Sequence, residues 1–176
     1  FKVFQKYHHL IYESNVRFSI EKVYQKVYFF NQEYAINLFF NFLDVSIEKA
    51  NKDDIKELLD YPWFEIFEFL LETDNINIFQ RLLKSIQKIS DKFKNEYSKK
   101  EFLITDQVFD SFMWQFEESL YRTWSLYRKT LQKISQLAQD DKDSFLELIK
   151  PYQDTRYLSL IAFLIFGYSK NPQEYK

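Results

Sequence analysis

The sequence contains no cysteine, one glycine, three prolines and two histidines in 176 residues. Without cysteine, the chain forms no disulfide framework, thiolate zinc site or iron–sulfur cluster. A single glycine is too few for phosphate-binding loops, which need several residues that lack a Cβ atom. It also argues against a β-rich fold, because tight hairpin turns rely on glycine. We therefore predict a protein without a cofactor or a resident metal ion.

Charge of neither sign dominates the sequence. It contains 24 Lys and Arg residues and 26 Asp and Glu residues, which gives a formal net charge of −2. Nucleic-acid-binding proteins usually carry a clear positive excess, so nucleic acid is not an expected partner. The longest apolar stretch, residues 158–166, is much shorter than the roughly 20 residues that cross a bilayer. We predict no transmembrane span in this stretch and leave contact with a membrane surface open. No signal peptide is visible, which favours a cytoplasmic location.

Aromatic residues are abundant, at 20 % of the chain, and apolar residues recur at helical spacing almost everywhere. In residues 33–50 and again in residues 76–97, apolar side chains fall on one face of a predicted helix. This pattern predicts an all-α fold, a bundle or short α-solenoid of about eight helices. We expect residues 1–176 to form a single all-helical domain. Because the sequence begins with Phe1, we also expect it to be a fragment of a longer chain.

Capping residues and helix breakers place several helix ends in the second half of the chain. Ser144 has the spacing of a capping residue for a short helix that Pro151 must end. Asp154 is the candidate start of the last helix. Gly167, the only glycine, is expected to end that helix as a left-handed C-cap.

One arrangement occurs twice along the chain, after Ala50 and again after Ala138. Each time an acidic loop leads into a short helix, a proline and an apolar helix, at an offset of about 90 residues. The pattern suggests an internal duplication of a helix–acidic loop–short helix–Pro–helix unit. The alternative is chance similarity between two ordinary helical hairpins.

The predicted helix over residues 105–138 carries two lines of large side chains. Its main apolar face includes Tyr127, Leu131 and Ile134 and is sufficient for packing against a core. A second line, displaced by roughly 100° around the helix, is spaced i, i+7, i+14. It consists of Trp114, Tyr121 and Arg128. These residue types are enriched at binding hot spots, so they are our candidate partner-binding residues. A central helix that packs against neighbours on two sides is the alternative explanation.

A basic row follows the helix predicted over residues 76–97, opposite its apolar face. It consists of Arg81, Lys84, Lys88 and Lys92. Such a row can bind phosphates or an anionic surface, which makes it a candidate site for an anionic partner. The alternative is a solvated face without a partner.

Catalytic and metal-binding patterns are weak. His9 and Glu13 share a helix face, but no third metal ligand is indicated. Glu65, Glu68 and Glu72 form an acidic line that leaves a carboxylate-dependent hydrolase as an alternative. We interpret the chain as a non-catalytic interaction, regulatory or scaffold domain, whose partner is another protein or a second copy. A third interpretation is the soluble domain of a membrane protein whose spans lie outside this stretch.

Overall fold

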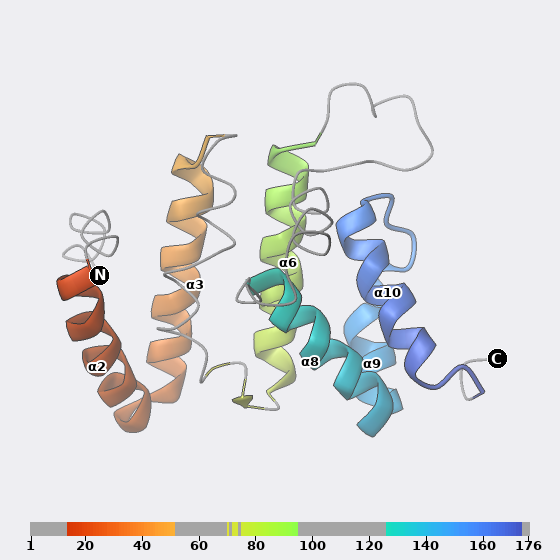
Figure 1. Ribbon diagram of the computed structural model, residues 1–176, viewed down its shortest axis with the longest axis horizontal. Coiled ribbons are helices and arrows are strands. Elements are labelled where there is room, and N and C mark those ends of the chain that lie inside the picture. Colours follow the sequence, from red (N-terminus) through yellow and green to blue (C-terminus); the bar gives the residue numbers. More distant parts are fainter. Residues whose placement is uncertain (1–13, 52–69, 71, 74, 95–125, 174–176) are drawn as a thin grey trace. The chain divides into compact units, whose positions relative to one another are not determined.

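The computed structural model describes residues 14–51, 70, 72–73, 75–94 and 126–173, which are mostly α-helical and include no strand. The predicted all-α class is therefore confirmed for this part of the chain (Figure 1). Contacts within the chain divide it into two compact units, Phe1–Asp74 and Asn75–Lys176. The predicted helix number, the duplication and the single domain also depend on residues outside the described ranges and stay predictions.

In the first unit, α2 (Ser14–Phe30) and α3 (Gln32–Lys49) form a helical hairpin (Figure 1). One residue, Asn31, separates the two helices and is the N-cap of α3. Its side-chain oxygen accepts a hydrogen bond from the backbone N–H of Tyr34 at 2.9 Å. Such a cap satisfies one of the donors left open at a helix start, which allows the chain to reverse over a very short link.

The inner face of α3 is the apolar stripe predicted from the sequence. Its most buried aromatic and aliphatic members are Phe39, Phe40, Leu43 and Ile47. The hydroxyl of the buried Tyr24 on α2 donates a hydrogen bond to the carbonyl of Ala35 on α3. The hairpin is therefore held by apolar packing together with a satisfied polar link between its helices.

The second unit contains four α-helices and a short 3-10 helix in its described residues. They are α6 (Ile76–Lys92), α8 (Leu126–Asp140), α9 (Lys142–Ile149), η4 (Lys150–Tyr152) and α10 (Leu158–Lys170). Helix α8 contacts α6, α9 and α10, and it crosses obliquely over α6 in Figure 1. Among the described helices of this unit, α8 and α10 make the most extensive helix–helix contact.

Apolar side chains predicted to face the core are buried in this unit. On α6 and at its C-terminal end they are Phe79, Leu82, Leu83, Ile86 and Phe93, and on α8 they are Tyr127, Leu131 and Ile134. The helical spacing of these residues places them on one face of each helix, which explains why that face is buried from solvent.

A buried polar cluster joins three helices of the second unit. The hydroxyl of Tyr127 on α8 donates to the carbonyl oxygen of Ser159 on α10 at 2.5 Å. The side-chain oxygen of Ser159 lies 2.7 Å from that of Ser90 on α6. Because both hydrogen bonds are buried, a shifted register between the helices would leave polar groups unpaired in the core. The cluster thus fixes how α8 and α10 sit against each other.

The short helix α9 begins earlier than predicted. Its N-cap is Asp141 rather than Ser144, because the Asp141 carboxylate accepts bonds from the backbone N–H of Ser144 at 3.1 Å and from its hydroxyl at 2.7 Å. These hydrogen bonds lower the pKa of Asp141. The predicted helix end is confirmed, since α9 stops at Ile149 and Pro151 lies in η4.

Two predictions about α10 are wrong. The helix does not start at Asp154: its first residue is Leu158 and Tyr157 occupies the N-cap position. Gly167 does not end it, because α10 continues to Lys170 and Gly167 is buried inside it. A Cβ atom on Gly167 would overlap the ring of Phe145 on α9. The glycine therefore allows close packing between helices, not a left-handed turn.

Candidate functional site

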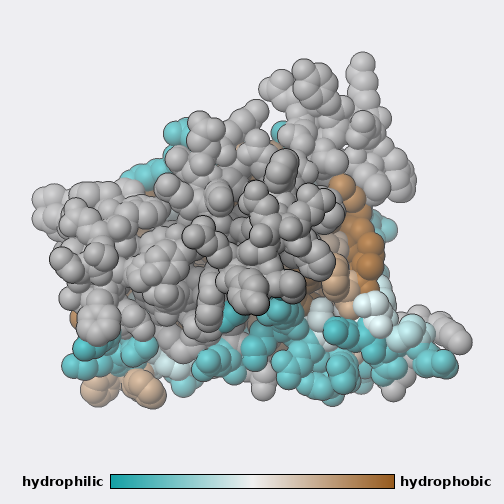
Figure 2. All heavy atoms as spheres, in the orientation of Figure 1, coloured by the Kyte–Doolittle hydropathy of each residue, from teal (hydrophilic) through white to brown (hydrophobic). Residues whose placement is uncertain are grey.

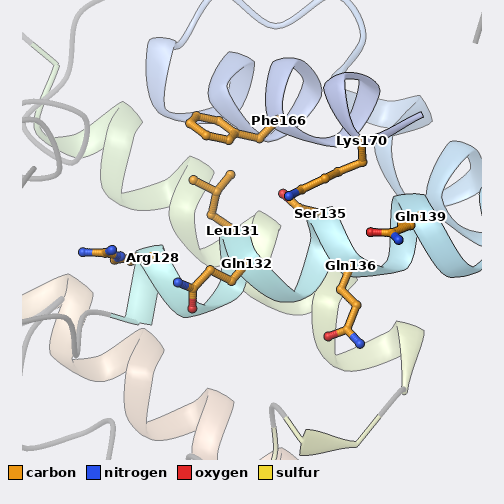
Figure 3. A pocket seen from close by; sticks show the side chains of 8 residues that line it. All are labelled: Arg128, Leu131, Gln132, Ser135, Gln136, Gln139, Phe166 and Lys170. Atoms are coloured by element: carbon orange, nitrogen blue, oxygen red, sulfur yellow. The ribbon is translucent and has the colours of Figure 1, made fainter. Parts of the chain in front are cut away.

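A groove with a volume of about 320 Å³ lies between α8 and α10, within the second unit (Figure 3). The described residues that line it are Arg128, Leu131, Gln132, Ser135, Gln136, Gln139, Phe166 and Lys170. The volume is at the lower end of the range typical of ligand-binding pockets. The groove is therefore large enough for a few side chains or a short peptide segment.

Helical periodicity explains why α8 lines the groove along its whole described length. Arg128, Gln132 and Gln136 are spaced i, i+4, i+8, and Ser135 and Gln139 are again four apart. Residues at these spacings lie on one helix face. Apart from Leu131, the face carries only polar or cationic side chains toward the groove. Helix α8 thus presents its core stripe to the interior and a polar line to the groove.

Helix α10 contributes the aromatic side of the groove. Its inner face is buried through Leu160, Ala162 and Phe163, yet Ile165 is 61 % exposed and Phe166 is 39 % exposed. Hydrophobic atoms accordingly gather on the surface over α10 in Figure 2. A helix that is apolar on all sides is normally buried on all sides. Helix α10 therefore has more apolar surface than the second unit covers.

The apolar and charged parts of the lining are separated along the groove. Phe166 and Lys170 project from α10 toward α8, and the ring of Phe166 lies above Leu131 in Figure 3. Leu131 is only 4 % exposed, so it forms an apolar floor. Arg128, which is half-buried, marks the N-terminal end of the α8 line, and Lys170 is exposed at the end of α10. The groove thus combines a small apolar spot with two cations.

Of the three predicted partner-binding residues, the structure describes one. Arg128 lines the groove, while Trp114 and Tyr121 lie outside the described residues. The predicted line of three therefore stays a prediction as a unit. Arg128 nevertheless lies at a concave surface that also contains an exposed aromatic side chain.

The predicted basic row lies on α6, opposite its buried face. Lys84, Lys88 and Lys92 are exposed and Arg81 is half-buried. The ammonium group of Lys92 lies 5.3 Å from the centroid of the Phe93 ring, within the range of a cation–π contact. The row is on the surface as the sequence indicated, and its binding of an anionic partner stays a prediction.

The candidate metal and hydrolase residues fall largely outside the described ranges. This applies to His9, Glu13, Glu65 and Glu68, while Glu72 is exposed. Among the residues that the structure describes, no three His, Cys, Asp or Glu side chains are grouped so that they could hold a metal ion. Within the same residues, no helix combines the length and apolar character required to cross a bilayer.

A second group of exposed apolar side chains lies at the α2–α3 corner of the first unit, visible in Figure 2. Phe29 is 85 % exposed and Phe30 is 91 % exposed, and Tyr34 adds to the same corner. Exposed charges on these helices have both signs, with Lys26 on α2 and Glu33 on α3. The corner therefore exposes apolar surface that a partner could cover, but its charges do not favour a partner of either sign.

No known family model, curated protein or solved structure matches this chain. The groove itself is therefore the basis for a proposal about function. Sequence patterns singled out Arg128 but not the other polar lining residues or Phe166. Two signals point to them in retrospect: the polar line that starts at Arg128 with helical spacing, and the uninterrupted apolar run Ile161–Phe166, which leaves α10 without a polar face.

Proposed function

We propose that this chain is a non-catalytic helical interaction module that holds a short segment of another protein in the groove between α8 and α10. The observation that carries the proposal is Phe166, a large aromatic side chain that remains 39 % exposed above the buried Leu131. Aromatic residues exposed beside a concave surface are typical of protein-binding sites. Arg128 in the same lining belongs to a residue type that is enriched at binding hot spots.

The dimensions of the groove favour a short linear segment over the flat face of a folded domain. The line from Arg128 to Gln139 advances by eleven residues, which corresponds to about 16 Å along a helix axis. An extended peptide covers that length with about five residues. Both ends of the line are marked by polar side chains that can bind the peptide main chain.

A selection from a peptide-display library tests the proposal directly. The full chain serves as bait beside two variants, Phe166→Asp and Ser169→Asp, which introduce the same charge on α10. Ser169 is exposed and does not line the groove, so it is the matched control. We expect peptides to be enriched on the wild type and on Ser169→Asp, and to be lost on Phe166→Asp, because a carboxylate at the apolar spot opposes burial of an apolar side chain.

A second variant keeps the test informative if Phe166→Asp disturbs folding. Gln136 is exposed in the groove, so Gln136→Trp should fill the groove without affecting the core. If the same peptides are enriched on the wild type, on Phe166→Asp and on Gln136→Trp, the proposal is contradicted. The proposal would also be contradicted if the wild type sediments as a dimer and the Phe166→Asp variant as a monomer. The groove would then be occupied by a second copy of the chain.

A further inference from the structure

The charge of the groove differs from that of the chain as a whole. The chain has a formal net charge of −2, yet the lining residues that the structure describes include two cations, Arg128 and Lys170, and no carboxylate. Complementary charge raises the association rate and suppresses partners of the wrong sign. The groove is thus locally suited to a partner with negative charge.

A row of amides provides the second part of the recognition chemistry. Gln132, Gln136 and Gln139 follow one another at roughly one-turn intervals along α8, and all three are exposed. Each side-chain amide can both donate and accept hydrogen bonds. A peptide main chain offers both kinds of group, so the row suits a main chain and does not by itself select a side-chain sequence.

The apolar spot provides the third part. Among the described lining residues, Leu131 and Phe166 are the apolar ones, and they come from the two opposing helices. The other described lining residues are polar or cationic, so the apolar part of the lining is small and is flanked by polar groups. A ligand with one apolar anchor and polar neighbours therefore matches the lining better than a continuous apolar segment.

We propose that the groove is selective for acidic segments of a partner protein, in which one apolar anchor is flanked by carboxylates. This inference depends on the proposed peptide-binding function and adds the chemistry of the partner. The anchor occupies the space between Leu131 and Phe166, the main chain bonds to the amide row, and the carboxylates face Arg128 and Lys170. Arginine can hold a carboxylate through two parallel hydrogen bonds, whereas lysine acts as a point charge.

The test uses three fluorescein-labelled eight-residue peptides that differ only in charge. Each has a central leucine, flanked by glutamates in the first peptide, by glutamines in the second and by lysines in the third. Fluorescence anisotropy measures their binding to the full chain. We expect the acidic peptide to bind about tenfold more tightly than the glutamine peptide, and the lysine peptide to bind most weakly.

Charge reversal on the protein should invert this order. The double variant Arg128→Glu/Lys170→Glu is expected to prefer the lysine peptide, a change that loss of stability cannot produce. Lys170→Glu alone is the second variant, because Lys170 is exposed and its replacement should leave the core intact. Lys133→Glu is the control, since Lys133 lies on α8 but does not line the groove, and it should keep the wild-type order.

The outcomes separate this inference from the proposed function. If the display selection yields groove-dependent peptides that are neutral or basic, the groove binds peptides but the acidic preference is wrong. If the acidic peptide binds equally well to the wild type and to both charge-reversal variants, Arg128 and Lys170 do not bind its carboxylates and the inference is also wrong. If no selected peptide loses binding to the Phe166→Asp or Gln136→Trp variant, the proposed function itself is wrong.

Discussion

At the scale of single residues, Gly167 lets α9 and α10 approach closely, because the ring of Phe145 fills the space that a Cβ atom would need. Glycine near the end of an apolar run is typical of a left-handed C-cap, and nothing local distinguishes that role from another. In the structure, the residue lies within α10 because the ring of Phe145 occupies the space where a Cβ would be. The reason is a tertiary contact between α9 and α10, and no local sequence pattern contains it.

Substitution Gly167→Ala should therefore destabilise the protein, although alanine is the better helix former. Alanine favours a helix over glycine by about 1 kcal/mol, whereas overpacking a core costs about 1–3 kcal/mol. We expect the free energy of unfolding to fall by about 1 kcal/mol in urea denaturation.

The variant Phe145→Leu supplies the control for Gly167→Ala, because it removes the ring that the new methyl group would meet. In that background Gly167→Ala should be neutral or stabilising. An equal loss of stability in both backgrounds would show that the contact with Phe145 is not the reason for the glycine.

At the scale of helices, the sequence was most informative about which face is buried. The stripes on α3, α6 and the described part of α8 are buried as predicted, because helical spacing alone determines which side chains share a face. Helix starts were less predictable. Asp141 and Ser144 are both acceptable caps by composition, and only the geometry selects Asp141. The start of α10 at Leu158 follows from the turn after η4, which the candidate cap Asp154 did not reveal.

The groove could be predicted from the sequence only in part. Arg128 was identified through its spacing along α8, but its neighbours Gln132, Gln136 and Gln139 are ordinary surface residues by composition. They form a site only because α10 lies beside them with Phe166. That arrangement depends on the buried contacts of Tyr127 and Ser159 between α8 and α10, which no local sequence pattern indicates.

The C-terminal end of α6 and the start of α10 are linked by a hydrogen bond that should depend on pH. The hydroxyl of Tyr157 donates to the carboxylate of Asp91 at 2.5 Å, and Lys94 lies 3.1 Å from the same oxygen. The Tyr157 bond, followed by the Lys94 interactions, lowers the pKa of Asp91 from its ordinary value of 3.8. The folded chain therefore binds fewer protons at this site than the unfolded chain does. The stabilisation is present above about pH 4 and is lost as the pH falls through the folded pKa.

We expect Asp91→Asn to reduce the acid-induced loss of stability measured by urea denaturation below about pH 4. The acid-induced loss in the free energy of unfolding should differ between the wild type and Asp91→Asn by less than about 1 kcal/mol, because the Asp91 side chain is 62 % exposed. Tyr157→Phe should flatten the same pH profile, and the double variant should add little to either single change. Additive effects of the two substitutions would contradict the link between α6 and α10.

At the scale of the whole molecule, the described residues form two compact helical units with different surfaces. The first unit exposes an aromatic corner with charges of both signs, and the second exposes an aromatic side chain above a cationic groove. The predicted all-α class follows from composition and periodicity. The division into units does not, because it depends on which helices contact one another across long sequence distances.

The central claim is that the chain binds a peptide segment in the α8–α10 groove, and side-chain amide NMR tests it most directly. In a nitrogen–proton correlation spectrum of the full chain, the acidic peptide should shift the NH₂ signals of Gln132, Gln136 and Gln139, which line the groove. The signals of Gln80 and Gln87, exposed on α6, should stay in place. Shifts confined to Gln80 and Gln87, or saturable binding that leaves all three groove amides unchanged, would contradict the account.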